Sequence, residues 1–168
     1  MSALNNAEII NGNNVNIIIL DDVDFTTPDQ PQIHYSKKDN LTIKSLGKSI
    51  NWGNDLSNIP SIEIENIRFD GVKINVPVTS VSRGKKNILR PKYNANYIFE
   101  NCNLTLNDSF IIGDYTNSCK KVFLTLINTT QNASNGGLVR NVPSSNEKIL
   151  LNYMQVGGRF LVLALEVT

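Results

Sequence analysis

Asparagine is the residue that most constrains how this chain folds. It makes up 25 of the 168 residues and punctuates short runs rich in Ile, Val and Leu, from Asn13 to Asn146. Asparagine tolerates left-handed backbone conformations, and its side-chain amide bonds to neighbouring backbone groups, so it is typical of turns and strand ends. The sequence therefore predicts many short strands joined by polar turns.

Strand patterns are dense, and helical spacing of apolar residues is nearly absent. Residues 15–20 form a β-branched run, and residues 62–65 alternate between apolar and acidic side chains. Asp70 and Gly71 separate this region from a second alternating run at 72–76, which predicts a β-hairpin. Further strands are expected at 41–45, 97–106, 110–112, 122–127, 149–154 and 160–167.

These patterns predict a single all-β domain over residues 1–168. Eight to ten strands without helices favour an antiparallel β-sandwich of the jelly-roll kind. The alternative is a right-handed parallel β-solenoid, because related phrases recur at 20–25, 40–43 and 65–69, close to the length of one solenoid turn. The rhythm breaks before Glu100, and the expected hairpin fits antiparallel pairing, so the sandwich is preferred.

Composition narrows the class of protein. The net charge of +1 excludes a strong overall attraction to nucleic acid or to an acidic membrane. The first residues show no basic stretch followed by an apolar one, so we expect synthesis in the cytoplasm without a signal peptide. Cys102 and Cys119 are interpreted as buried thiols, with one disulfide between them as the alternative. No metal or other cofactor is expected.

Catalytic patterns are weak throughout the chain. His34 is the single histidine, and no Gly-x-Ser-x-Gly motif supplies a nucleophile for it. Glu63 and Glu65 share one side of a strand, but the carboxylates of a glycosidase normally come from different strands that line a cleft. A solvated strand face explains their alternation fully. We therefore predict no catalytic residue and no enzymatic activity.

Charge is distributed unevenly along the chain. A basic loop is predicted to make assembly or anion contacts, although contact with nucleic acid or lipid is not favoured because aromatic residues do not alternate with the basic ones. The basic loop consists of Arg83, Lys85, Lys86, Arg90 and Lys92. The first thirty residues contain no Lys or Arg, and they offer an acidic counter-patch at Asp21, Asp22 and Asp24. Pairing of the two patches between subunits predicts a head-to-tail ring, a homo-oligomer.

A second surface candidate is the polar turn around the single tryptophan. Trp52 lies between Asn51 and Asn54, and an exposed indole beside amides is suited to contact a glycan. The preferred interpretation is nevertheless that Trp52 covers one end of the core.

The sequence therefore favours a non-enzymatic structural protein of an assembled particle, acting through contacts with itself and with other particle proteins. A bacteriophage or virus virion is the expected location, with a capsid, vertex, decoration or tail role. The alternative is a carbohydrate-binding β-sandwich module. A polysaccharide lyase or hydrolase would first require the solenoid fold.

Overall fold

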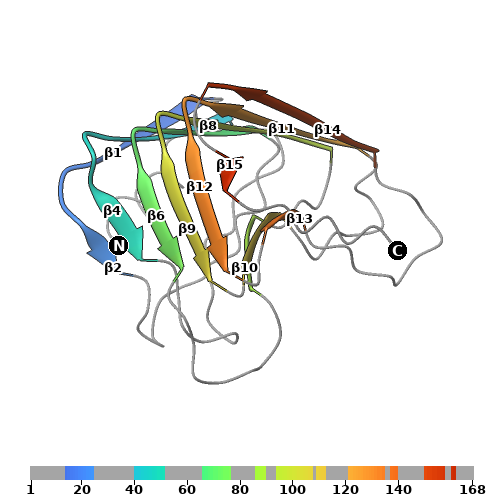
Figure 1. The fold of residues 1–168 in the computed structure, drawn as a ribbon. Helices are drawn as coiled ribbons and strands as arrows, with labels where there is room; N and C mark the ends of the chain where they lie inside the picture. The colour runs from blue at the N-terminus through green and yellow to red at the C-terminus, as the bar shows by residue number, and fades with distance from the viewer. Residues whose placement is uncertain are drawn as a thin grey trace.

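The protein folds into strands alone over the part of the chain that the computed structural model describes. That part comprises residues 14–24, 40–51, 66–76, 86–89, 94–107, 109–112, 121–134, 137–139, 150–157 and 160–161. Within these ranges there are fifteen strands and no helix, arranged in three sheets (Figure 1).

Sheets A and B each contain six strands, and sheet C contains three. In spatial order, sheet A consists of β1 (Asn14–Ile19), β3 (Asn40–Ser45), β5 (Asn66–Asp70), β8 (Ala95–Glu100), β11 (Lys121–Ile127) and β14 (Leu150–Val156). Sheet B consists of β2 (Val23–Asp24), β4 (Ser49–Asn51), β6 (Lys73–Val76), β9 (Asn103–Asn107), β12 (Thr130–Ser134) and β15 (Phe160–Leu161). Sheet C consists of β7 (Lys86–Leu89), β10 (Ser109–Ile112) and β13 (Gly137–Val139).

The chain winds as a parallel β-solenoid. Each turn, or rung, passes from a strand of sheet A to one of sheet B, and three rungs continue into sheet C. Every strand pair is parallel, and the strands of sheet B follow one another from blue to red in Figure 1. The register of sheet A places one residue of each rung in a single column, which contains Val15, Leu41, Ile67, Tyr97, Leu124 and Tyr153. The number of residues between successive members of this column varies, so the rungs are similar but not identical in length.

The antiparallel sandwich predicted from the sequence is wrong, and so is the jelly roll. The Asp70–Gly71 step does not close a hairpin, because β5 pairs with β3 and β8 whereas β6 pairs with β4 and β9. A run of alternating apolar and polar residues fits a half-buried strand in either pairing direction, so alternation did not distinguish the two folds. The virion and capsid interpretation that accompanied the jelly roll loses this architectural basis. The three parallel sheets fit the alternative, a parallel β-solenoid.

A column of left-handed residues turns the chain from sheet A to sheet B in rungs two to six. This corner column consists of Gly47 (φ 79°), Gly71 (70°), Asn101 (53°), Asn128 (47°) and Gly157 (66°). Glycine and asparagine are the residues that adopt this conformation most readily. Backbone hydrogen bonds continue through the corner, from Gly71 N to Glu100 O (2.9 Å), Asn101 N to Ile127 O (2.9 Å) and Asn128 N to Val156 O (2.7 Å). The corner therefore keeps successive rungs in register.

The core lies inside the solenoid and is built from columns of apolar side chains. Every second residue of a strand points inward, and because neighbouring strands are in register, like side chains stack on one another. The rings of Phe69 and Phe99 stack with centroids 4.8 Å apart and planes inclined by 7°. Ile74 and Leu104 occupy one inward column of sheet B, and both are fully buried. One continuous cluster thus links the rungs.

Candidate functional site

The outer face of sheet A carries the greatest variety of outward side chains among the described strands. They form three rows that run from rung to rung. The amide row contains Asn14, Asn40, Asn66, Asn96 and Phe123 and ends at the register position of Asn152. The middle row contains Asn16, Thr42, Arg68, Ile98, Thr125 and Met154. The corner row contains Ile18, Lys44, Asp70, Glu100, Ile127 and Val156.

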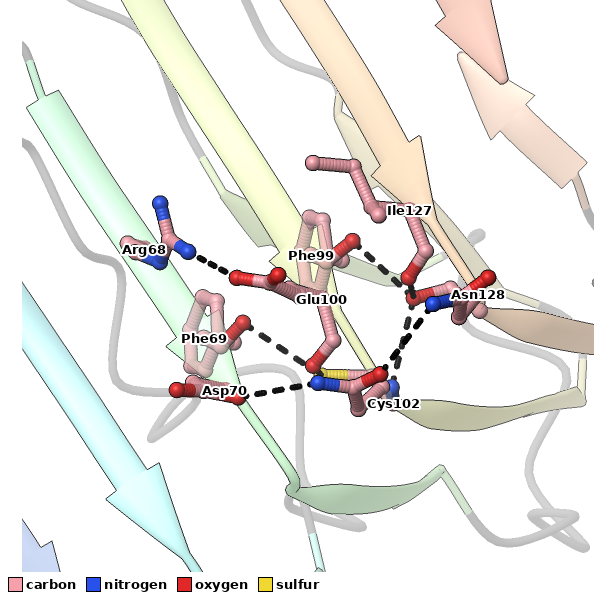
Figure 2. Close-up of polar contacts among 10 residues, drawn as sticks. Arg68, Phe69, Asp70, Phe99, Glu100, Cys102, Ile127 and Asn128 are labelled. Carbon is pink, nitrogen blue, oxygen red and sulfur yellow. Dashed lines mark hydrogen bonds and ion pairs between the residues drawn. The ribbon is translucent and has the colours of Figure 1, made fainter. Parts of the chain in front are cut away.

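A charged cluster occupies the centre of this face. It consists of Lys44, Arg68, Asp70 and Glu100, on β3, β5 and β8. Figure 2 shows Arg68 and Glu100 facing each other from adjacent strands, where they form an ion pair. Asn101 Nδ2 donates a hydrogen bond to Asp70 Oδ1 (3.4 Å), and Asn128 Nδ2 donates to Asn101 Oδ1 (3.5 Å). Each carboxylate of the cluster is therefore bonded to the neighbouring rung.

Asp70 and Glu100 are the carboxylates that most resemble a catalytic pair. They are register partners on adjacent strands, so their backbones are about 4.8 Å apart. Retaining glycosidases use carboxyl groups separated by about 5–5.5 Å. Here, however, Glu100 is held by the Arg68 guanidinium and Asp70 accepts from the Asn101 amide. Both carboxylates are therefore engaged in side-chain contacts that link one rung to the next, which we call the side-chain ladder.

Beneath the charged cluster, two buried side chains bond the corner from inside the solenoid. Thr129 Oγ1 accepts a hydrogen bond from Cys102 N (3.2 Å) and lies within donating distance of Phe99 O (2.9 Å) and Ile127 O (3.0 Å). Cys102 Sγ lies 3.2 Å from Glu100 O and 3.5 Å from Phe69 O (Figure 2). Burial raises the pKa of the Cys102 thiol to about 11, so the thiol is neutral at physiological pH. The prediction of a buried free thiol is confirmed for Cys102.

The outer face of sheet A becomes apolar toward β14. Phe123 is 41% exposed, Met154 53% and Val156 52%, and Ile98 and Ile127 lie beside them with partial exposure. Lys121 Nζ lies 4.6 Å from the centroid of the Phe123 ring. This cation–π contact is favourable for Phe123. The neighbouring apolar side chains of Ile98, Ile127, Met154 and Val156 cannot make a contact of this kind, because they have no aromatic ring.

The opposite end of the same face is also apolar. Ile18, in the corner row of β1, is 66% exposed, and Leu20, which follows β1, is 76% exposed. The amide row crosses this end with a hydrogen bond from Asn40 Nδ2 to Asn14 Oδ1 (2.9 Å). Exposed apolar side chains on the strands of sheet A therefore lie at β1 and at β11 and β14, on either side of the charged cluster. Beyond the strands, Leu46, which follows β3 beside the cluster, is 99% exposed.

Sheet B presents a polar outer face by comparison. One outward row contains Asn51, Asn75, Thr105 and Asn132, and the other contains Ser49, Lys73, Asn103 and Thr130. Asn75 Nδ2 donates to Asn51 Oδ1 (3.3 Å), again from one rung to the next. The two outer faces thus differ: amides and hydroxyls dominate on sheet B, whereas sheet A carries charged and apolar groups beside its amide row.

The acidic counter-patch predicted from the sequence lies at the N-terminal end of the solenoid. Asp21 and Asp22 follow β1, and Asp24 ends β2. Asp22 Oδ1 accepts a hydrogen bond from Ser49 N (2.8 Å), and this bond lowers the pKa of Asp22 below its usual value. Asp21 Oδ1 lies 3.8 Å from Lys48 Nζ. Two of the three acids therefore already contact the second rung of their own chain.

Most of the other predicted site residues lie outside the described residues. Lys86 begins β7, but its side chain is outside the described part of the chain. Arg83, Lys85, Arg90, Lys92, Trp52, Asn54, His34, Glu63, Glu65 and Cys119 are outside the described ranges. Asn51 ends β4 and belongs to the outer row of sheet B. Pairing between the basic loop and the acidic counter-patch therefore stays a prediction.

The charged cluster was not found by reading the sequence. Its members lie on three successive rungs and are far apart along the chain, so their proximity depends on the register between rungs. The available signal was the corner column, in which Gly or Asn recurs once in each of rungs two to six, at 47, 71, 101, 128 and 157. Aligning the sequence on these positions places Asp70 and Glu100 in equivalent places, each directly before the corner residue, whereas Lys44 comes three residues before Gly47.

No protein family matches this chain, and neither a curated protein nor a solved structure is significantly similar to it. Over the described ranges, no helix is long and apolar enough to cross a membrane. Within the same ranges, no three His, Cys, Asp or Glu side chains are grouped so that they could hold a metal ion. The functional argument therefore rests on the surfaces of the solenoid.

Proposed function

We propose that this protein is a non-enzymatic structural protein, and that its solenoid is a rigid element within a larger assembly of subunits. The observation that carries the proposal is how its outward polar side chains are used: they bond from rung to rung. The contacts Asn40–Asn14, Arg68–Glu100, Asn101–Asp70, Asn128–Asn101 and Asn75–Asn51 all join adjacent rungs.

Such contacts favour a structural role for a physical reason. A catalytic carboxylate must be free to contact substrate, and its pKa must suit proton transfer or nucleophilic attack. Glu100 and Asp70 are instead held by neighbours in the side-chain ladder. Side chains that repeat in register and bond to their neighbours restrain bending of the sheet, as a rigid element of an assembly requires.

The test is the mass of the protein in solution, measured by multi-angle light scattering over a wide concentration range at low and high salt. We expect an oligomer, because the apolar ends of sheet A are exposed in the single chain. A monomer under every condition would contradict the proposal. A location within an assembled particle stays a prediction.

A carbohydrate-binding role is the second candidate, and the outer face of sheet B supports it. Asn51, Asn75, Thr105 and Asn132 place amides and a hydroxyl at the regular spacing of the strands, about 4.8 Å. Amides and hydroxyls are the groups that hydrogen-bond to sugar hydroxyls. On a glycan array, Asn75→Ala should then lose binding that Asn96→Ala, on the outer face of sheet A, retains. Absence of saturable binding by the unsubstituted protein would exclude this candidate.

A further inference from the structure

We infer that copies of this protein stack end to end, with β14 of one copy pairing in parallel with β1 of the next. The inference rests on the proposed function and specifies its partner as a second copy of the same chain. It predicts a heterologous contact along the solenoid axis.

The two end strands of sheet A have open edges in the described part of the chain. There, β1 pairs with β3 alone, and β14 pairs with β11 alone. An open edge presents unpaired backbone N–H and C=O groups, which form a template for another strand. Because all strands of the sheet are parallel, the outer edge of β14 is complementary to that of β1.

Stacking in register also continues the outward rows of the sheet. The amide row begins at Asn14 and ends at the position of Asn152, so two asparagine positions become neighbours across the junction. The corner row begins at Ile18 and ends at Val156, so two aliphatic residues become neighbours. Like residues in neighbouring register positions stabilise a sheet through side-chain contacts. The middle row would place Asn16 beside Met154, so two of the three outward rows continue with like residues across the junction.

Exposure provides independent support. The corner row is charged in its centre, at Lys44, Asp70 and Glu100, and aliphatic at both ends. Ile18 is 66% exposed and Val156 is 52% exposed, and stacking would bury the two against each other.

The interior of the solenoid is also less well covered at its N-terminal end. Val15 is 8% exposed, whereas its register partner Leu41 is 2% exposed and Tyr97, two rungs further on, is 0% exposed. Ile17 and Ile19 point inward beside Val15 and are only partly buried. A further rung beyond β1 would cover these side chains, as each rung within the solenoid covers the next.

This junction differs from the ring contact expected from charge pairing. Asp21 and Asp22 lie at the same end but already contact Lys48 and Ser49 of their own chain. A heterologous contact that advances along one axis without closing gives an open linear assembly. Apolar and backbone contacts would hold this junction, so its stability should depend little on salt.

Cysteine cross-linking tests the register directly. Neighbouring parallel strands are about 4.8 Å apart, within the range of about 4.4–6.8 Å between Cα atoms that a disulfide spans. The double variant Ile18→Cys, Val156→Cys, in a Cys119→Ser background, should form a series of covalent multimers under mild oxidation on a non-reducing gel. The matched control is Ile18→Cys, Phe123→Cys, because Phe123 is also exposed but lies one rung from the end. The control should stay uncross-linked.

Two further measurements keep the outcomes distinct. Separately purified Ile18→Cys and Val156→Cys proteins should form disulfide-linked heterodimers when mixed, and Val156→Lys should reduce the oligomer mass in light scattering. If the unsubstituted protein is oligomeric but neither result is obtained, end-to-end stacking is wrong and the structural function stands. If the unsubstituted protein is monomeric and no cross-link forms, both are wrong.

Discussion

Replacement of Gly71 by alanine tests whether the left-handed corner column determines the fold. Gly71 adopts φ 70°, and a Cβ atom built on it would lie 2.2 Å from Ser45 O in the preceding rung. Ordinary van der Waals contact begins at 3.4 Å, so one rung would have to move by about 1 Å to restore normal packing. That movement would strain the bonds from Gly47 N to Gly71 O (3.1 Å) and from Gly71 N to Glu100 O (2.9 Å).

The expected loss of stability follows from these terms. A residue with a Cβ atom in the left-handed region costs about 1–2 kcal/mol. Weakening of two backbone hydrogen bonds adds about 1–3 kcal/mol. Gly71→Ala should therefore lower the free energy of unfolding by about 2–5 kcal/mol, which for a chain of this size corresponds to roughly 4–20 °C in melting temperature.

Gly47→Ala is the matched control for this experiment. Gly47 has a similar φ of 79°, but the nearest atoms to an added Cβ are at 4.0 Å, on the flexible Lys73 side chain. It should cost only the conformational term, about 1–2 kcal/mol. Thermal unfolding followed by circular dichroism measures both variants. Equal melting temperatures for the two would refute the argument that close approach of rungs at the corner determines stability.

Three more predictions concern the polar contacts near the corner. Thr129→Val should lower the free energy of unfolding in urea by about 2 kcal/mol, because it leaves the buried Cys102 N–H without its acceptor. Thr129→Ser keeps the hydroxyl and should lower it by only about 1 kcal/mol. The reverse order would show that the methyl group of Thr129 contributes more than its hydroxyl. The Cys102 pKa lies above its ordinary value of 9.0, so the neutral thiol stabilises the fold below pH 9 and this contribution is lost as the pH rises through about 11. The stability difference between the unsubstituted protein and Cys102→Ala should shrink by about 2–3 kcal/mol over that interval, and a constant difference would contradict the burial argument. A double-mutant cycle on Arg68 and Glu100 should give a coupling of no more than about 1 kcal/mol that weakens with salt, because the Arg68 side chain is 41% exposed.

Strand positions could be predicted from the sequence because they are encoded locally. The strand expected at 15–20 is shifted by one residue from the observed β1, which spans 14–19. The strand expected at 41–45 begins one residue later than the observed β3 and ends at the same residue. Alternation of apolar and polar residues is sufficient to place such strands. The expected strand at 97–106 is interrupted in the structure, because Asn101 adopts the left-handed conformation and the chain changes sheets there.

Pairing direction and the charged cluster could not be predicted in the same way. Both depend on which strands become neighbours across a whole rung of the chain, and one Asp-Gly step is compatible with either a hairpin or a corner. Arg68 and Glu100 are 32 residues apart in the sequence, so they first come together in the register of β5 with β8. Information about pairing lay in the spacing of Gly47, Gly71, Asn101, Asn128 and Gly157, and not in any one motif.

Because the rungs wind in register, the number of rungs sets the length of sheet A along the solenoid axis. Each rung adds one strand spacing, about 4.8 Å, to sheet A, however long the rung is. The longer rung between β5 and β8 therefore advances the axis as far as the shorter one between β3 and β5, and the difference is taken up outside the sheet A strands. A gene that gained or lost the sequence of one rung would therefore encode a solenoid that is longer or shorter by one strand spacing, with the same outer faces.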